Sequence, residues 1–446
     1  MTAIAQSLST LSGLLWGWPL VLTLFGVHLF LTVRLGFIQR YLPLAIRLSF
    51  SRKREGAGDV SQFGALMTAL AATIGTGNIV GVATAVAAGG PGAVLWMWLT
   101  GVFGISTKYA EALLSVKYRI LTPQGTMAGG PMYVLEKGLK SKPLGVLFAA
   151  FTAVAAFGIG NMVQANSLAG QLQQGAGVAP WVSGLLMALL TALVVLGGIK
   201  SIARACEWLV PFMAIFYVLG CLALLAFAAG DLWPALKLIF TSAFSGHEAI
   251  LGGFAGAGMK EAVRYGVARG LFSNESGLGS APIVAAAAQT RNPVRQALVS
   301  STGTFWDTVV VCALTGLVVV AYGDWKGGFK GVELTRRAFA HIPQIGPAIL
   351  TVGLATFVFS TILGWSYYGE KAMEYLFGPR VIIGYRVAWV VFVFIGATVP
   401  LHAVWDFADI ANALMALPNL LALLLLSGVV ARETRKYLKE QSLDSE

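Results

Sequence analysis

The chain has 446 residues, of which 57% are hydrophobic and only 11% are charged. This composition excludes a soluble globular protein and predicts an all-α integral membrane protein embedded in the lipid bilayer. The net charge of +11 is spread over the connections between apolar segments, so it does not form a patch for binding nucleic acid.

Eleven apolar segments long enough to cross a bilayer follow one another along the chain. They cover residues 12–33, 60–88, 91–116, 143–172, 180–199, 205–229, 246–266, 293–322, 345–373, 381–400 and 406–430. No cationic region precedes the first segment, so we expect a retained helix and not a cleaved signal peptide. The sequence thus predicts eleven transmembrane helices.

Basic residues are concentrated in alternate connections. If the N-terminus is outside, 26 of the 31 Lys and Arg residues fall in inward-facing segments. The positive-inside rule therefore predicts an N-terminus outside the cell and a cytoplasmic C-terminus. The expected location is the cell inner (plasma) membrane, which the chain crosses many times.

A glycine-rich interruption lies in the second apolar segment, within AATIGTGNIVGVATAVAAGGP over residues 71–91. Gly75 and Gly77 bracket Thr76 and lead into Asn78 about half-way along the segment. An opened helix exposes amide groups on one side and carbonyls on the other, which lipid tolerates only beside protein or a polar cavity. The interruption predicts a polar ligand site at mid-membrane depth, although small residues also serve close helix packing.

A second interruption is predicted at GGFAGAG, Gly252–Gly258, with Phe254 inside it. It lies in the seventh segment, five segments after the first interruption. Because five is odd, two groups of five helices would run in opposite directions, as in an inverted repeat with two discontinuous helices. The predicted organisation is an extra N-terminal helix and amphipathic inner linker over 1–59, a first repeat over 60–230, a second repeat over 231–431 and a cytoplasmic tail over 432–446. Within the second repeat, the Gly-rich residues 267–292 predict a short helix or hairpin.

Hydroxyl groups in the ninth segment suit a small hard cation. Ser360 and Thr361 follow Phe357, and the carbonyls of Ala71 and Ile74 end the half-helix before the first interruption. Hydroxyl and carbonyl oxygens are ligands for sodium. The alternative is that each hydroxyl bonds to its own helix, as is common in membranes.

Three further side chains fit a polar cavity. Gln164 can accept from an ammonium and donate to a carboxylate, although helix-to-helix bonding is commoner for a membrane Gln. Trp365 shares a helix face with Thr361 and can wall the cavity. Asp307 is an intramembrane acid, with either a functional role, including a proton route, or a structural role beside Thr304 and Thr308.

Enzyme motifs are absent from the sequence. It has no P-loop, no H-E-x-x-H and no G-x-S-x-G, and its four histidines are scattered. An enzyme is therefore not expected, whereas a channel lined by the same polar interruptions stays as an alternative to a carrier.

Three motifs carry a family resemblance. GTGNIVGVATAV (75–86) continues into GGPGAVLWMW (89–98), STKYAE (106–111) follows, and GVARGLFSNESGLGSAP (266–282) comes later. These segments resemble the alanine or glycine:cation symporter family, also called the sodium:alanine symporter family, within the amino acid, polyamine and cation transporter superfamily. The likeness covers about residues 60–430, with Ser276 where the family usually has Ala.

The resemblance implies a sodium-coupled importer of small neutral amino acids such as alanine and glycine, with a proton-coupled symporter as the alternative. It implies substrate contacts from Thr76, Gly77, Asn78, Gln164, Phe254, Thr361 and Trp365. It also implies that the coupling sodium ion is held by Ala71, Ile74, Phe357, Ser360 and Thr361, the first three through backbone carbonyls.

Overall fold

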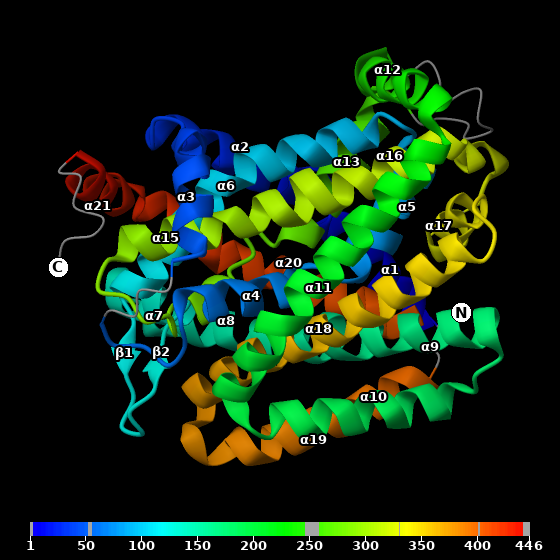
Figure 1. Cartoon of the computed structure of the whole chain (residues 1–446). Coiled ribbons are helices and arrows are strands. Elements are labelled where there is room, and N and C mark those ends of the chain that lie inside the picture. The colour runs from blue at the N-terminus through cyan, green and yellow to red at the C-terminus, as the bar shows by residue number, and fades with distance from the viewer. Residues whose placement is uncertain (1–2, 52–55, 246–257, 330, 400–401, 440–446) are drawn as a thin grey trace.

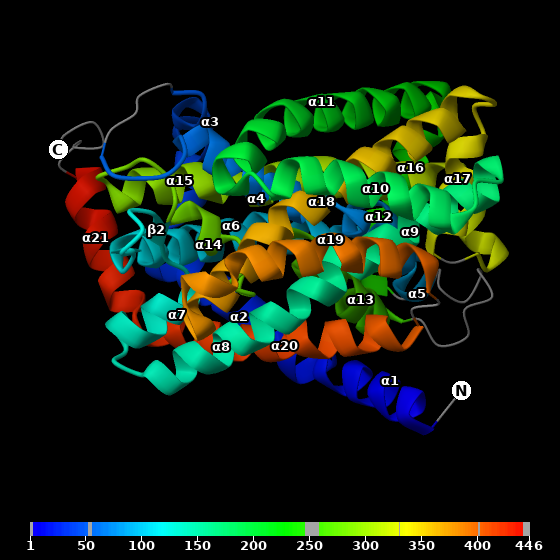
Figure 2. The ribbon, with the colours of Figure 1, turned by 90° about the horizontal axis from the view of Figure 1, so that it is seen from below.

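A computed structural model of the chain describes residues 3–51, 56–245, 258–329, 331–399 and 402–439. Long helices lie roughly parallel in one bundle, and the N- and C-termini lie at opposite ends of it (Figures 1 and 2). Strands β1 (Ile120–Leu121) and β2 (Met127–Ala128) pair antiparallel in a short hairpin at the end of the bundle that carries the C-terminus.

The first half of the chain contains helices α1 to α11. Their bounds are α1 Ala3–Leu15, α2 Trp18–Arg34, α3 Leu42–Ser49, α4 Gln62–Thr73, α5 Val82–Gly89, α6 Ala93–Lys117, α7 Pro131–Tyr133, α8 Lys142–Ala155, α9 Val163–Ala176, α10 Pro180–Val195 and α11 Gly198–Phe227. Three π-helical stretches lie in this half: Gly77–Gly81 continues into α5, Val134–Gly138 follows α7, and Ala156–Met162 joins α8 to α9.

The second half contains helices α12 to α21. Their bounds are α12 Ala229–Ser245, α13 Met259–Asn274, α14 Pro282–Ala285, α15 Pro293–Thr304, α16 Ala313–Tyr322, α17 Gly331–Ala340, α18 Ile345–Phe377, α19 Ile382–Thr398, α20 His402–Leu425 and α21 Ser427–Lys439. A fourth π-helical stretch, Phe305–Cys312, joins α15 to α16. The short helix predicted within 267–292 is confirmed as α14.

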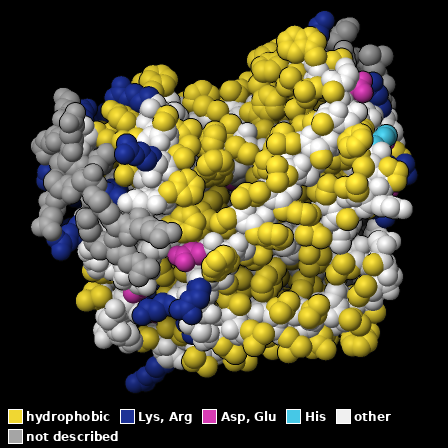
Figure 3. Space-filling model, viewed as in Figure 1, with side chains coloured by type: hydrophobic (Ala, Val, Ile, Leu, Met, Phe, Trp, Pro, Cys, Tyr) yellow, Lys and Arg dark blue, Asp and Glu magenta, His cyan; other side chains and the backbone are white. Residues whose placement is uncertain are grey.

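Seven helical runs in the described chain are long and apolar enough to cross a membrane, and the bent pair of α4 with Gly77–Gly89 makes eight. A broad hydrophobic band covers the middle of the bundle, and most of the Lys and Arg side chains in view lie toward its ends (Figure 3). The protein is therefore a multi-pass, all-α membrane protein, and the count of eleven crossings stays a prediction.

The region of the predicted seventh segment needs a correction. Residues 246–257 lie outside the described residues, and the following helix, α13, runs from Met259 to Asn274. Its Arg264 and Arg269 line a cavity with Ser9 of α1 and Asp406 of α20, beside the N-terminal helix. Lys260 lies on the same helix, nearer its start. These three basic residues therefore do not belong to an inward connection, because α13 continues into the bundle. Without them, 23 of 31 basic residues still favour the predicted inner side.

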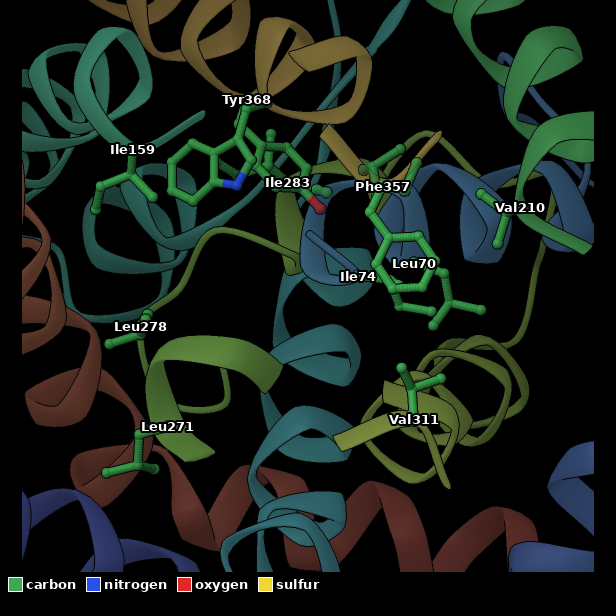
Figure 4. Packing of buried hydrophobic residues seen from close by; sticks show 14 of the residues in the cluster. Leu70, Ile74, Ile159, Val210, Leu271, Leu278, Ile283, Val311, Phe357 and Tyr368 are labelled. Carbon is green, nitrogen blue, oxygen red and sulfur yellow. The ribbon is translucent and has the colours of Figure 1, made fainter. Parts of the chain in front are cut away.

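Two helices organise the interior. α6 packs against α13, α15 and α2, and α18 packs against α11, α8 and α4. Leu70 and Ile74 at the end of α4 lie beside Phe357 of α18 in the hydrophobic interior (Figure 4). Gly364 lets α18 approach this closely, because a Cβ there would come 2.7 Å from the backbone nitrogen of Ala72. The end of α4 is thus held at the centre of the bundle.

Candidate functional site

The helix that starts with α4 is broken where the sequence predicted it. α4 ends at Thr73, Ile74 is extended (φ −78°, ψ 95°), and the helical run from Gly77 to Gly89 is bent by 51° from α4. Gly75 is required at the break, since a Cβ on it would lie 2.5 Å from Thr361 Oγ1. The break is therefore a packed structural feature.

The amide groups that follow the break bond to side chains instead of helix carbonyls. The Gly75 N–H donates to Asn78 Oδ1 (2.8 Å), and the Thr76 N–H donates to Gln164 Oε1 (3.3 Å). Gln164 Nε2 donates back to Thr76 Oγ1 (3.1 Å) and to Ile159 O (3.0 Å). In a continuous helix the two amides would bond four residues back, to Ala71 and Ala72. This end of the break has the polarity that suits an anionic group.

Oxygen atoms gather on the other side of the break. Ser360 Oγ and Thr361 Oγ1 lie 3.5 and 3.3 Å from Ile74 O, and each also donates to Phe357 O at 2.9 Å. All four residues are at most 2% exposed. The structure thus shows both features considered from the sequence, the bond of each hydroxyl to its own helix and the approach to the Ile74 carbonyl. Ala71 is buried one turn earlier in α4, and its usual amide partner, that of Gly75, is directed to Asn78.

A third group of polar atoms surrounds Asp307. Asn78 Nδ2 donates to Asp307 Oδ1 (2.7 Å), Ser273 Oγ donates to Oδ2 (3.0 Å), and Thr308 Oγ1 donates to Oδ2 (2.6 Å). The other expected neighbour, Thr304, contacts Ser276 instead. Since Asn78 also accepts from Gly75, its carboxamide is engaged at both ends and braces the break.

A second interruption lies opposite the first. α13 ends at Asn274, Glu275 takes a left-handed conformation (φ 57°), and α14 begins only at Pro282. A Cβ on Gly77 would lie 3.5 Å from Ser273 and 3.6 Å from Phe272, so the first break faces the end of α13. The predicted interruption at Gly252–Gly258 and its Phe254 lie outside the described residues, except that Gly258 precedes α13 as its N-cap.

Phe272, Ser273 and Glu275 were not predicted as site residues, because residues 267–292 were interpreted as a short helix or hairpin between apolar segments. The available signal was the spacing of Gly277 and Gly279 directly after a polar run, which resembles Gly75 and Gly77 in the first break. Both of these later glycines have positive φ, 89° and 88°, a conformation that only glycine adopts readily.

Trp365 lies one turn after Thr361 in α18. Its ring is 1% exposed, lies against Gly160 and makes an edge-on contact with Tyr368. Its Nε1–H donates to Glu275 Oε1 (3.0 Å), which ties α18 to the second interruption. The indole is therefore fixed in position, as a wall that limits the size of a ligand would need to be.

A cavity of about 240 Å³ reaches the same region from the side of α1. Its lining includes Arg264, Arg269, Asp406 and Asp409, and Phe272 belongs to it as well. Phe272 also lies against Gly77, so one residue both lines the cavity and contacts the first break.

Comparison with known proteins identifies the class of protein to which this site belongs. Residues 1–446 match the sodium:alanine symporter family over their whole length. The chain belongs to this family. It is therefore a transporter of the symporter class and not an enzyme, and the resemblance read from the three motifs is confirmed.

Two relatives and one solved structure describe the similarity. The chain is 53% identical over 440 residues to the sodium/alanine symporter AgcS of Methanococcus maripaludis, covering 96% of each chain. It is 51% identical over 446 residues to an uncharacterized transporter of Haemophilus influenzae, covering 99% and 98%. Its fold is similar to that of MhsT in complex with L-phenylalanine, with a TM-score of 0.54, 15% identity, and coverage of 86% of this chain and 99% of that chain.

The packing at the break predicts that replacement by alanine has opposite effects on stability at Gly75 and at Gly81. Gly75→Ala adds a methyl group against Thr361 Oγ1, so we expect a loss of about 1–3 kcal/mol of stability from overpacking. Gly81→Ala is the matched control, because a Cβ on Gly81 meets no atom within 4 Å and Ala favours a helix. Thermal unfolding of the purified proteins in detergent measures both.

The double variant Gly75→Ala/Thr361→Ala removes the clashing oxygen and should recover part of the lost stability. Equal unfolding temperatures for Gly75→Ala and Gly81→Ala would show that the break is not packed as described.

Proposed function

We propose that this protein is a secondary active transporter that carries small neutral amino acids, alanine and glycine, into the cell together with sodium. The observation that carries the proposal is the break at Ile74–Asn78, where redirected amides lie on one side and a cluster of oxygens on the other. A zwitterion and a small cation suit these two sides. The relative from Methanococcus maripaludis, named a sodium/alanine symporter, supports the same substrate and ion.

In this proposal the substrate carboxylate binds at the amides of Thr76 and Gly77, and Gln164 turns from Thr76 to the ligand. Gln164 has an acceptor and a donor at the site, so it can bond to either charged group of an amino acid. Thr361 and Trp365 line the opposite wall. Asn78 acts by holding the Gly75 amide in place, since its own carboxamide is bonded within the protein.

The proposed sodium ligands are the carbonyls of Ala71, Ile74 and Phe357 and the hydroxyls of Ser360 and Thr361. The donor set fits the ion, because it contains five oxygens and neither nitrogen nor sulfur. The mutual approach of the Ile74 carbonyl and the two hydroxyls supports the assignment. The bound ion would draw α18 toward the end of α4.

Coupling follows from the shared position of the two ligands. Sodium at the carbonyl side and a carboxylate at the amide side would stabilise the same opened conformation of one helix. Each ligand then raises the affinity for the other by the same factor, because the coupling free energy is reciprocal. Alternating access converts this coupling into uphill transport.

We propose that the chain crosses the membrane eleven times, as one N-terminal helix followed by two inverted groups of five, with the N-terminus outside. The opposite placement of the termini supports an odd number of crossings (Figure 1). The approach of the first break to the end of α13 supports a pair of discontinuous helices that meet at the site.

The direct test is uptake of labelled alanine into proteoliposomes under an inward sodium gradient, compared with an equal potassium gradient at fixed pH. We expect accumulation above equilibrium only with sodium. Uptake that merely equilibrates under either gradient would contradict the proposal and favour a channel.

A proton-coupled symporter is the second candidate, because buried Asp307 accepts hydrogen bonds from both broken segments through Asn78 and Ser273. A carboxyl group in this position can link proton binding to the arrangement of the two segments. Concentrative uptake driven by an inward pH gradient without sodium would select this candidate.

The sodium assignment predicts a specific effect of Thr361→Ala. Loss of one ligand should raise the sodium concentration for half-maximal uptake about tenfold, equivalent to roughly 1.4 kcal/mol. Thr361→Ser keeps the hydroxyl and should stay close to wild type. Thr356→Ala is the matched control, because its partly exposed hydroxyl donates within α18, to Val352 O and Gly353 O, and to no other described residue. An unchanged sodium requirement in Thr361→Ala would remove this residue from the site.

The wall formed by Trp365 predicts a change in selectivity. Trp365→Ala opens space beside the break, so larger neutral amino acids should compete with alanine for uptake. Trp365→Phe keeps most of the bulk but loses the bond to Glu275, and it should keep the selectivity for small substrates. Competition by a series from glycine to phenylalanine measures both variants, and the same profile in all three proteins would refute the role of the wall.

A further inference from the structure

Lys108 of α6 is a buried cation outside the proposed binding site. Its side chain is 3% exposed, and its Nζ is fully buried without a hydrogen-bond partner among the described residues. It lines a cavity of about 10 Å³, the size of one water molecule. The cavity lies between α4 at Thr73, the start of α14 at Pro282, and α15 at Ser300. Lys108 thus lies where both interrupted segments meet the rest of the bundle.

Three buried acids act on this ammonium, Glu111, Glu275 and Asp307. Lys108 is also the basic group that acts electrostatically on each of them. None of the three forms a direct ion pair with Lys108 within the described part of the chain. The Lys108 side chain therefore lies near three buried acids, and its Nζ is hydrogen-bonded to none of them in the described part of the chain.

All three acids belong to the second interruption or hold it. Glu111 Oε1 accepts from the amides of Gly277 (3.0 Å) and Gly279 (3.1 Å) and from Asn419 Nδ2 (2.7 Å). Glu275 lies in the interruption and bonds to Trp365, and Asp307 accepts from Ser273. The acids near Lys108 are therefore the same acids that hold or form the second interruption.

A symporter of the proposed kind must return empty across the membrane after it releases its ligands. Release of sodium removes one positive charge from this region, and uncompensated buried charge is strongly unfavourable. A lysine side chain is flexible, and neither Lys108 Nζ nor Glu111 Oε2 has a hydrogen-bond partner among the residues that the structure describes. The ammonium can therefore shift toward the carboxylates when sodium leaves.

We propose that Lys108 supplies a positive charge, held on a flexible side chain, that replaces the charge of sodium while the empty carrier returns across the membrane. The inference rests on the proposed sodium-coupled transport and adds a residue to it. Lys108 acts through the three acids and does not touch substrate or sodium, so it is a positioning residue. Replacement of Lys108 by an uncharged residue should slow the return of the empty carrier. It should have little effect on the rate at which the carrier moves with sodium and substrate bound.

The test compares two assays of labelled alanine in proteoliposomes. Net uptake under a sodium gradient requires the empty return, whereas exchange against internal alanine, with sodium on both sides, does not. We expect Lys108→Met to lower net uptake at least tenfold and exchange less than threefold. Retained exchange also shows that the variant is folded. Lys117→Met is the matched control on the same helix, because Lys117 forms only a partly exposed pair with Glu433 (2.7 Å) and both rates should stay near wild type.

A second variant separates charge from packing. Lys108→Met/Glu111→Gln removes one positive and one negative charge, and Gln keeps the Oε1 that accepts from Gly277, Gly279 and Asn419. The proposal expects this double variant to recover net uptake at least threefold over Lys108→Met. Equal losses in both assays without recovery, or no loss in either assay, would overturn it. Absence of sodium-driven uptake in the wild type would instead refute the proposed function and this inference with it.

Discussion

The opened backbone at Ile74–Asn78 is the constraint on which the rest of the structure depends. Peptide groups without partners cost several kcal/mol each in a membrane interior, so a helix can open only where other groups satisfy them. Gln164, Asn78, Ser360 and Thr361 meet this requirement here. These side chains come from α9, from α18 and from the break itself. The same bonds that make the break tolerable therefore fix the helices around it.

A backbone group that is hydrogen-bonded to a side chain differs from one that is hydrogen-bonded within a helix. Side-chain partners can turn to a ligand and back, whereas a helix carbonyl cannot leave its amide without unwinding the turn. The second interruption is held in the same manner, by Glu111, by Asp307 and by the bond between Glu275 and Trp365. Side chains thus hold both interruptions, and in the proposed transport these partners exchange for ligands.

Several parts of the site were visible in the sequence because they are local. Gly75 and Gly77 mark the first break through their own lack of side chains, and the hydroxyls of Ser360 and Thr361 stand out in an apolar helix. The role of Asn78 was less accessible. The family resemblance implied a substrate contact for it, but its carboxamide is bonded to Asp307, 229 residues away. Phe272, Ser273 and Glu275 were passed over because their segment is too polar to read as part of a membrane helix.

The sequence by itself determined that the chain is a helical membrane protein of the sodium:alanine symporter family with a break in its second apolar segment. Hydropathy, glycine placement and family motifs are properties of neighbouring residues, so they need no knowledge of packing. Only the tertiary structure decided which polar groups meet. Trp365 bonds to Glu275, Asn78 bonds to Asp307, and Lys108 lies near three buried acids. Helices distant in sequence pack side by side, and a buried polar group bonds to the partners that this packing brings within reach.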